Sequence, residues 1–123
     1  MISTKIHGYL DYIMGATLLV LPLFLEIPAG AASTLPVILG AGVIVYSLIT
    51  DYELGLLKIL AMKTHLLLDL LGGALLIVTP WLFGFADETF WPFIILGVLE
   101  IGASLMTEKK PSYDANPEHH EGR

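Results

Sequence analysis

The sequence predicts an all-α membrane protein, in which four transmembrane helices form two tandem, parallel two-helix repeats. Its composition points to a membrane protein, because 55% of the 123 residues are hydrophobic and 15% are charged, against about 25% charged residues in an average soluble domain. A second observation sets the arrangement, because the second half of the chain resembles the first. Four apolar segments follow one another along these two halves.

Each apolar segment approaches the length of about 20 residues that a helix needs to cross the hydrocarbon core of a bilayer. We expect helices at residues 4–25, 33–51, 63–84 and 89–107. The pattern breaks at "EIPAG", which contains Pro28 and Gly30, and at "FADET", which contains adjacent acids. Pro22 and Pro80 lie near the ends of the first and third segments, where we expect helix termination or a gentle kink.

Two further segments do not fit a span. Residues 52–62, "YELGLLKILAM", are too short, so we expect an interfacial helix or an extension of the third span. Residues 111–123, "PSYDANPEHHEGR", are polar and contain two prolines, which predicts a disordered cytoplasmic tail. The expected four-helix transmembrane domain therefore occupies residues 1–110.

The internal repeat aligns residues 5–50 with residues 63–107, and we place repeat one at 4–51 and repeat two at 63–107. Equivalent positions are Lys5 and Lys63, His7 and His65, Asp11 and Asp69, Gly15 and Gly73, Gly40 and Gly97, Ser47 and Ser104, and Thr50 and Thr107. Each unit holds two spans, so the chain returns to its starting side after the first unit. The repeat is therefore parallel, with a pseudo-twofold axis along the membrane normal.

The basic residues predict the orientation. All six lie at the N-terminus, in the middle connection or in the tail, whereas the other two loops carry only Glu26, Asp87 and Glu88. The positive-inside rule then predicts that both termini are cytoplasmic. We expect a multi-pass protein of the inner (plasma) membrane. The second outer loop is flanked by rings that are typical of a headgroup-level aromatic belt: Trp81, Phe83, Phe85, Phe90 and Trp91.

Charge and cysteine content exclude several functions. The net charge of −6 comes with few, scattered basic residues, which argues against a nucleic-acid partner. Without cysteine there is no disulfide framework, no thiolate metal site and no thiol redox chemistry. We expect the lipid bilayer as the surrounding partner and no cofactor, and leave open a membrane or cytoplasmic protein partner and a homo-oligomer.

Five ionisable residues lie within the predicted spans. His7 and Asp11 share a helix face, and so do His65 and Asp69, because each pair is four residues apart. An Asp near the centre of a span costs about 2.5 to 3.5 kcal/mol on insertion scales, so we expect these side chains to face the interior of the bundle. Glu100 enters the fourth span by a similar distance, but its counterpart in repeat one is Val43. The second unit is thus the more polar one.

Two interpretations of these residues remain open. In the first, His and Asp form a structural network, completed by nearby hydroxyl groups, and the protein is a non-enzymatic structural or interaction module. The candidate hydroxyl groups belong to Ser47, Ser104, Thr50, Thr64, Tyr9, Tyr12 and Tyr46. In the second, His7, Asp11, His65 and Asp69, with Glu100, bind a divalent cation or pass protons. No pattern of a nucleophile with its base is present, so we assign no catalytic residue and rank an enzyme third.

The segment "TPWLFGF" carries a resemblance to a known family. Thr79, Pro80 and Trp81 end the first helix of the second unit, and repeat one has Leu21, Pro22 and Leu23 at these positions. A proline motif at this point of a duplicated two-helix unit resembles the SPW-repeat family of small integral membrane proteins, with Thr in place of Ser. The resemblance covers residues 4–107 and implies a fold and a membrane location, but no biochemical activity.

Overall fold

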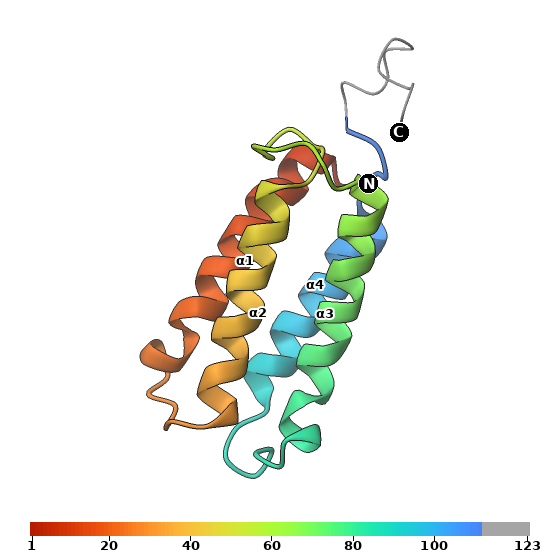
Figure 1. Ribbon diagram of the computed structural model, residues 1–123. Helices are drawn as coiled ribbons and strands as arrows, with labels where there is room; N and C mark the ends of the chain where they lie inside the picture. Colours follow the sequence, from red (N-terminus) through yellow and green to blue (C-terminus); the bar gives the residue numbers. More distant parts are fainter. Residues whose placement is uncertain (112–123) are drawn as a thin grey trace.

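A computed structural model describes residues 1–111 of the chain, and these residues form four helices that lie side by side (Figure 1). The helices are α1 (Thr4–Phe24), α2 (Ala31–Leu48), α3 (Met62–Leu82) and α4 (Trp91–Met106). The described part contains two isolated β-bridges and no strand. The predicted all-α class and the four helices are confirmed, whereas residues 112–123 of the predicted tail lie outside the described residues.

The helices associate as two hairpins. α1 packs extensively on α2 and α3 on α4, while the contact between α2 and α3 is smaller. Glycines permit the close approach within each hairpin: a Cβ on Gly40 would lie 2.7 Å from the Gly15 carbonyl oxygen, and one on Gly97 would lie 2.6 Å from that of Gly73. The same contact thus occurs in both hairpins, as expected for two tandem repeats.

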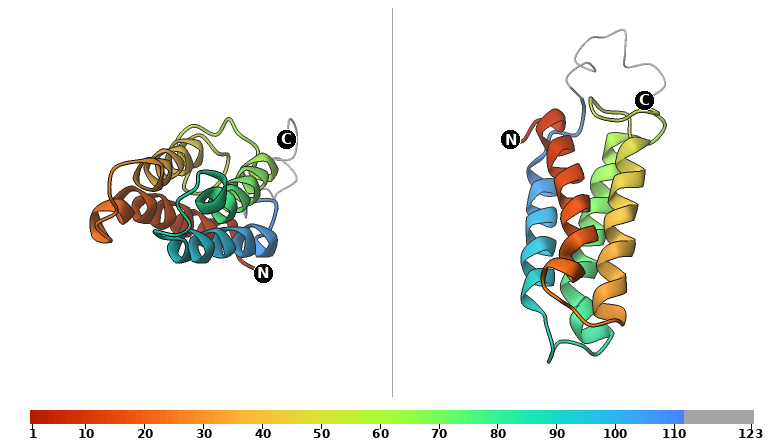
Figure 2. Two further views of the ribbon diagram at one scale, coloured as in Figure 1. Left: turned by 90° about the horizontal axis from the view of Figure 1, so that it is seen from below. Right: turned by 90° about the vertical axis from the view of Figure 1, so that its left-hand side faces the viewer.

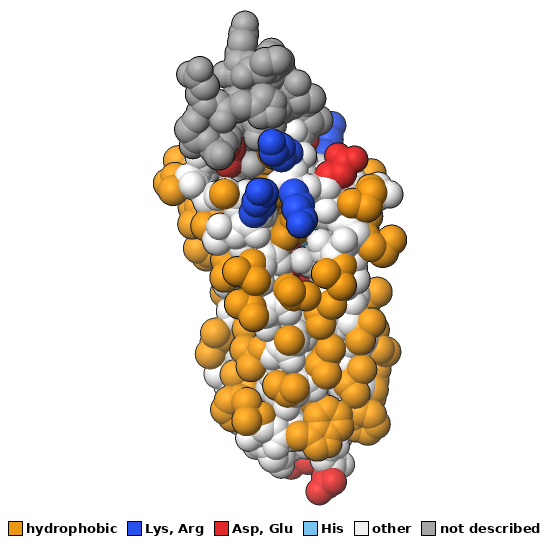
Figure 3. Space-filling model, turned by 90° about the vertical axis from the view of Figure 1, so that its right-hand side faces the viewer, with side chains coloured by type: hydrophobic (Ala, Val, Ile, Leu, Met, Phe, Trp, Pro, Cys, Tyr) orange, Lys and Arg blue, Asp and Glu red, His pale blue; other side chains and the backbone are white. Residues whose placement is uncertain are grey.

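Three of the helices are long and apolar enough to cross a membrane. α1, α2 and α3 have 21, 18 and 21 residues with mean hydropathy of 1.3, 1.8 and 1.7, whereas α4 is shorter, with 16 residues. On the face drawn in Figure 3 the surface is largely hydrophobic, with basic side chains gathered toward one end and acidic side chains at both ends. Figure 2 shows the four helices running along a common direction, with α1 beside α2 and α4.

The prediction of a helix over residues 52–62 is wrong. This segment forms turns that fold back over the end of α2, with the backbone N–H groups of Leu56 and Leu57 donating to the Leu48 carbonyl oxygen at 2.8 and 3.0 Å. Gly55 permits the tight turn, because a Cβ there would lie 1.8 Å from the Thr50 carbonyl oxygen. The fold-back ends α2 three residues before the predicted boundary and directs Tyr52 into the protein.

The predicted aromatic belt also needs one correction. Trp81, Phe83, Phe90 and Trp91 are about half exposed, but Phe85 is buried and its ring lies 5.1 Å from that of Phe93. The reason is local, because residues after α3 form a turn that returns the chain inward at Phe85, whose N–H donates to the Pro80 carbonyl oxygen at 2.8 Å. Phe85 therefore belongs to the core.

The two hairpins are also connected at the end that carries the N-terminus. Ile2 lies beside the end of α4, where its N–H donates to Met106 O at 2.8 Å and its carbonyl accepts from Glu108 N at 2.9 Å. Leu60 lies beside the end of α2 in the equivalent way, bonded to Ile49 O at 2.8 Å and to Asp51 N at 2.7 Å. Each bridge joins the start of one repeat to the end of the other.

Candidate functional site

Four ionisable side chains meet where the first turns of α1 and α3 approach each other. His7, Asp11, His65 and Asp69 are each no more than 5% exposed, and one nitrogen or oxygen of each lies within 4.8 Å of the others. We call these four residues the His/Asp quartet. Their spacing of four residues places each histidine one helical turn before its aspartate. The structure thus brings together the four residues that the repeat singled out.

The Nε2 atom of each histidine faces both aspartates. His7 Nε2 lies 2.9 Å from Asp11 Oδ1 and 2.7 Å from Asp69 Oδ2. His65 Nε2 lies 2.9 Å from Asp11 Oδ2 and 3.2 Å from Asp69 Oδ2, as close polar contacts whose angles are poor for a hydrogen bond. Each imidazole therefore contacts the carboxylate of its own repeat and that of the other.

The opposite ring nitrogen, Nδ1, is held by a threonine of the other repeat. His7 Nδ1 lies 2.7 Å from Thr107 Oγ1, and His65 Nδ1 lies 2.7 Å from Thr50 Oγ1. Both hydroxyls donate their own proton to the carbonyl oxygen four residues earlier in the chain, at 2.5 Å. Each hydroxyl is left as an acceptor, so each imidazole carries a proton on Nδ1. Carboxylate oxygens only accept, so Nε2 needs a second proton to donate to them.

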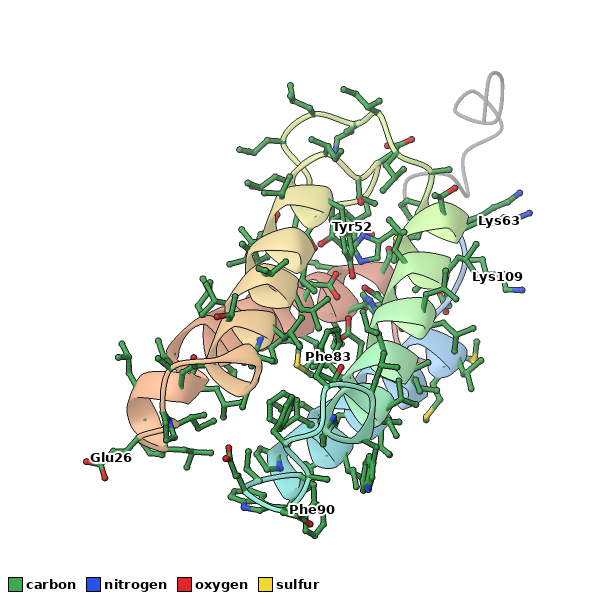
Figure 4. The ribbon with its side chains drawn as sticks, turned by 60° about the horizontal axis from the view of Figure 1, so that its bottom comes forward. Glu26, Tyr52, Lys63, Phe83, Phe90 and Lys109 are labelled. Atoms are coloured by element: carbon green, nitrogen blue, oxygen red, sulfur yellow. The ribbon has the colours of Figure 1, made fainter. Side chains whose placement is uncertain are left out.

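Two tyrosines complete the surroundings of the carboxylates. Tyr52 OH donates to Asp11 Oδ2 at 3.0 Å, and Tyr46 OH donates to Asp69 Oδ1. Figure 4 shows Tyr52 on the connection that covers the helix ends, pointing into the bundle, whereas Lys63 and Lys109 point outward. Burial, with a smaller effect of the Asp11 charge, raises the pKa of the Tyr52 hydroxyl, which favours its role as a donor.

The hydroxyls named from the sequence divide into two groups. Thr50 and Tyr46 join the quartet, and Ser47 is buried beside Tyr52. The others do not contact it: Ser104 donates to Leu66 O, Tyr12 donates to Leu54 O, and Thr64 and Tyr9 are exposed. Sequence reasoning missed Thr107, although its alignment with Thr50 was a usable signal. It also missed Tyr52, which has no partner in the repeat.

Glu100 joins the site from α4. It is 6% exposed, and its side chain lines the same space between α1 and α4 as His7, Asp11 and Asp69. Within residues 1–111, no Lys, Arg or His nitrogen forms an ion pair with it. Since repeat one has Val43 at this position, the extra carboxyl makes the site asymmetric.

The quartet can balance charge in two ways. Two ionised aspartates and two imidazoles that carry a proton on each nitrogen sum to zero. Two ionised aspartates, two neutral imidazoles and one divalent cation also sum to zero. The donor set of two nitrogens and two carboxylates suits a borderline or hard divalent metal. Outer hydrogen bonds from a metal-binding histidine to a neighbouring oxygen are usual, and Thr50 and Thr107 provide them.

The Thr-Pro-Trp motif lies at the opposite end of α3 from the quartet. Thr79 is buried and donates to Leu75 O at 2.5 Å, and Pro80 lies within the last turn of the helix. Trp81 is 57% exposed, with its ring 6.1 Å from that of Phe90. The motif therefore shapes the helix end and makes no contact with the quartet.

Comparison with known proteins gives one match. The family model described as SPW repeat domain matches residues 5–107, which include both repeats and the whole quartet. Neither the curated proteins nor the solved structures contain a match to the chain. The fold and the geometry of the site are thus the main sources of functional information.

Proposed function

The chain belongs to the SPW repeat family, and on this basis we propose that it is a four-span inner-membrane module whose two repeats are joined by the His/Asp quartet. Three apolar helices of 18 to 21 residues support the membrane location. α4 would reach about 24 Å at 1.5 Å per residue, and a bilayer adapts to a short span at modest cost. The basic residues at one end support cytoplasmic termini.

One observation carries the structural role of the quartet. Each imidazole contacts carboxylates from both repeats and a threonine from the other repeat. Side chains that bond across membrane helices in this way hold the helices together, because an unpaired polar group in hydrocarbon is costly. We therefore assign the quartet to the joining of the two hairpins, in a module that acts through contacts rather than through catalysis.

The test compares unfolding of variants in detergent micelles. The pair His65→Gln and Asp69→Asn removes the charges of one repeat, and we expect a large fall in the free energy of unfolding. Thr64→Ala, on the exposed face of the same helix, serves as the matched control and should leave stability unchanged. Equal stability of the double variant and the control would reject the structural assignment.

A second candidate function is the binding of a divalent cation, favoured by the convergence of four donor atoms within 4.8 Å. From the two charge-neutral states we expect binding of one cation to release two protons. Titration calorimetry with Zn²⁺ or Mn²⁺ in two buffers of different ionisation enthalpy measures this number. Wild-type protein that binds neither ion, or that binds without proton release, would exclude this candidate and leave the structural role intact.

Topology is tested separately. A reporter that fluoresces only in the cytoplasm is fused after Arg123, and another is inserted in the loop at Glu26. We expect signal from the first fusion and none from the second. The reverse result would overturn the proposed orientation.

A further inference from the structure

A cavity of about 620 Å³ lies between α1 and α4 and reaches the quartet. Its walls are apolar, with Ile13 and Met14 on α1 and Leu99 and Met106 on α4. The ionisable groups that line it are those of His7, Asp11, Asp69 and Glu100. A concave apolar site of this volume with a few converging polar groups is typical of sites for small molecules.

A comparison of the two repeats explains why the cavity lies between α1 and α4. The seam between α2 and α3 is the pseudo-symmetric counterpart of the one between α1 and α4. There Tyr46 fills the space, with its ring 4.9 Å from that of His65 and its hydroxyl on Asp69. The equivalent of Tyr46 on α4 is Ala103, and the residue before it is Gly102 in place of Val45. Small side chains at these two positions line the cavity.

The charges at the cavity select a kind of ligand. Three carboxyl groups line it, from Asp11, Asp69 and Glu100, but the quartet offers only two imidazoles. The two imidazoles pair with the aspartates, so Glu100 is the carboxyl without a cation among the described residues. Within the same part of the chain, no Lys or Arg lines the cavity. An ammonium group would complement this end, and a hydrocarbon body would complement the walls.

We propose that the cavity between α1 and α4 binds an amphiphilic amine, with its ammonium group at Glu100 and its hydrocarbon body against Ile13, Met14 and Leu99. The hydrocarbon packs against the apolar walls, and the charged hydrogen bond to a carboxylate supplies selectivity for an amine over an alcohol. This site goes beyond the structural role of the quartet. It needs no metal ion.

The experiment uses the full chain in lipid nanodiscs and three photoreactive probes with the same alkyl chain and diazirine. They are dodecylamine, dodecanol and dodecanoate derivatives, and mass spectrometry locates the labelled residues. We expect saturable labelling of α1 and α4 residues at the cavity, with half-saturation by the amine at a concentration about tenfold lower than by the alcohol. Equal half-saturation by the amine and the alcohol would identify an ordinary acyl-chain site and overturn the proposal.

Two variants test the charge of Glu100 and the space beside Ala103 separately. Glu100→Gln keeps the size of the side chain, and we expect it to remove the preference for the amine while alcohol labelling is retained. Ala103→Tyr copies repeat one into repeat two and should abolish cavity labelling by both probes. Ile95→Val, at an exposed position of α4 outside the cavity, is the control. An unchanged amine preference in Glu100→Gln would overturn the proposal, even if Ala103→Tyr failed to fold.

Discussion

The two repeats share a framework of equivalent residues, but the space between α2 and α3 is filled differently from the space between α1 and α4. Both contribute a histidine, an aspartate and a threonine to the quartet, and both use a pair of glycines for close helix contact. They differ where the hairpins face each other, because Tyr46 closes one seam and Ala103 leaves the other open. Residues that join the hairpins thus recur, whereas residues that fill space between them have diverged.

This comparison indicates which positions are free to change. Repeat two has Glu100 where repeat one has Val43, and Ala103 where repeat one has Tyr46, yet the histidine contacts of both repeats are present. These two differences add a carboxyl and a cavity on one side only. A duplicated unit can therefore keep its structural core in two copies and change one copy for binding.

We expect the largest effect from substitution of the two aspartates, which tests whether they are equivalent. Asp69→Ala should lower the free energy of unfolding by about 3 to 5 kcal/mol, because it breaks buried charged pairs. Each aspartate contacts both histidines and accepts from one tyrosine, but Asp69 is 0% exposed and Asp11 is 5% exposed, so Asp11→Ala should cost less. Unfolding by denaturant in micelles measures both. A larger loss for Asp11→Ala would show that the deeper burial of Asp69 adds no stability.

The glycine contacts test the shared framework. Gly73→Ala places a Cβ 2.8 Å from the Gly97 carbonyl oxygen, and we expect a loss of about 1 to 3 kcal/mol from this overpacking. Gly72→Ala, next in the chain, meets no atom within 4 Å and should be neutral or stabilising by up to about 1 kcal/mol. Thermal unfolding of the two variants provides the comparison. Similar unfolding temperatures would contradict the close packing.

The threonines test the pseudo-symmetry of the histidines. Thr107→Val and Thr50→Val each remove the acceptor of an imidazole Nδ1 proton, so each should cost about 1 to 3 kcal/mol. The matching serine variants keep the hydroxyl and serve as controls. Nitrogen NMR of labelled histidine reports the loss at His7 in the first variant and at His65 in the second. A change at both histidines in either variant would argue against separate pairs.

The smallest expected effect concerns Tyr52, which has no equivalent in repeat two. Tyr52→Phe removes the donor to Asp11 and should cost about 1 kcal/mol. Since burial raises the pKa of this hydroxyl, its contribution to stability is complete below the unfolded value of about 10 and falls as the pH rises above it. The decline in unfolding free energy above pH 10 should be weaker in the variant. Identical pH profiles would contradict this role.

Much of the fold followed from the sequence, because duplication and hydropathy are encoded along the chain. The alignment of His7 with His65 and of Asp11 with Asp69 identified the residues that meet. Their contacts with Thr107 and Tyr52 depend on how helix ends and the connection fold back, which periodicity does not describe. For the same reason the turns near Gly55 were predicted as a helix. The cavity beside Ala103 depends on the distance between two helices.

The bridges at Ile2 and Leu60 have a topological consequence. Each places the beginning of one hairpin against the end of the other, so the molecule has the connectivity of a dimer of hairpins whose subunits happen to be covalently linked. Opening the chain between Gly55 and Leu60 would leave the quartet and both bridges with all their partners. One hairpin, with one histidine, one aspartate and one threonine, thus supplies half of this centre.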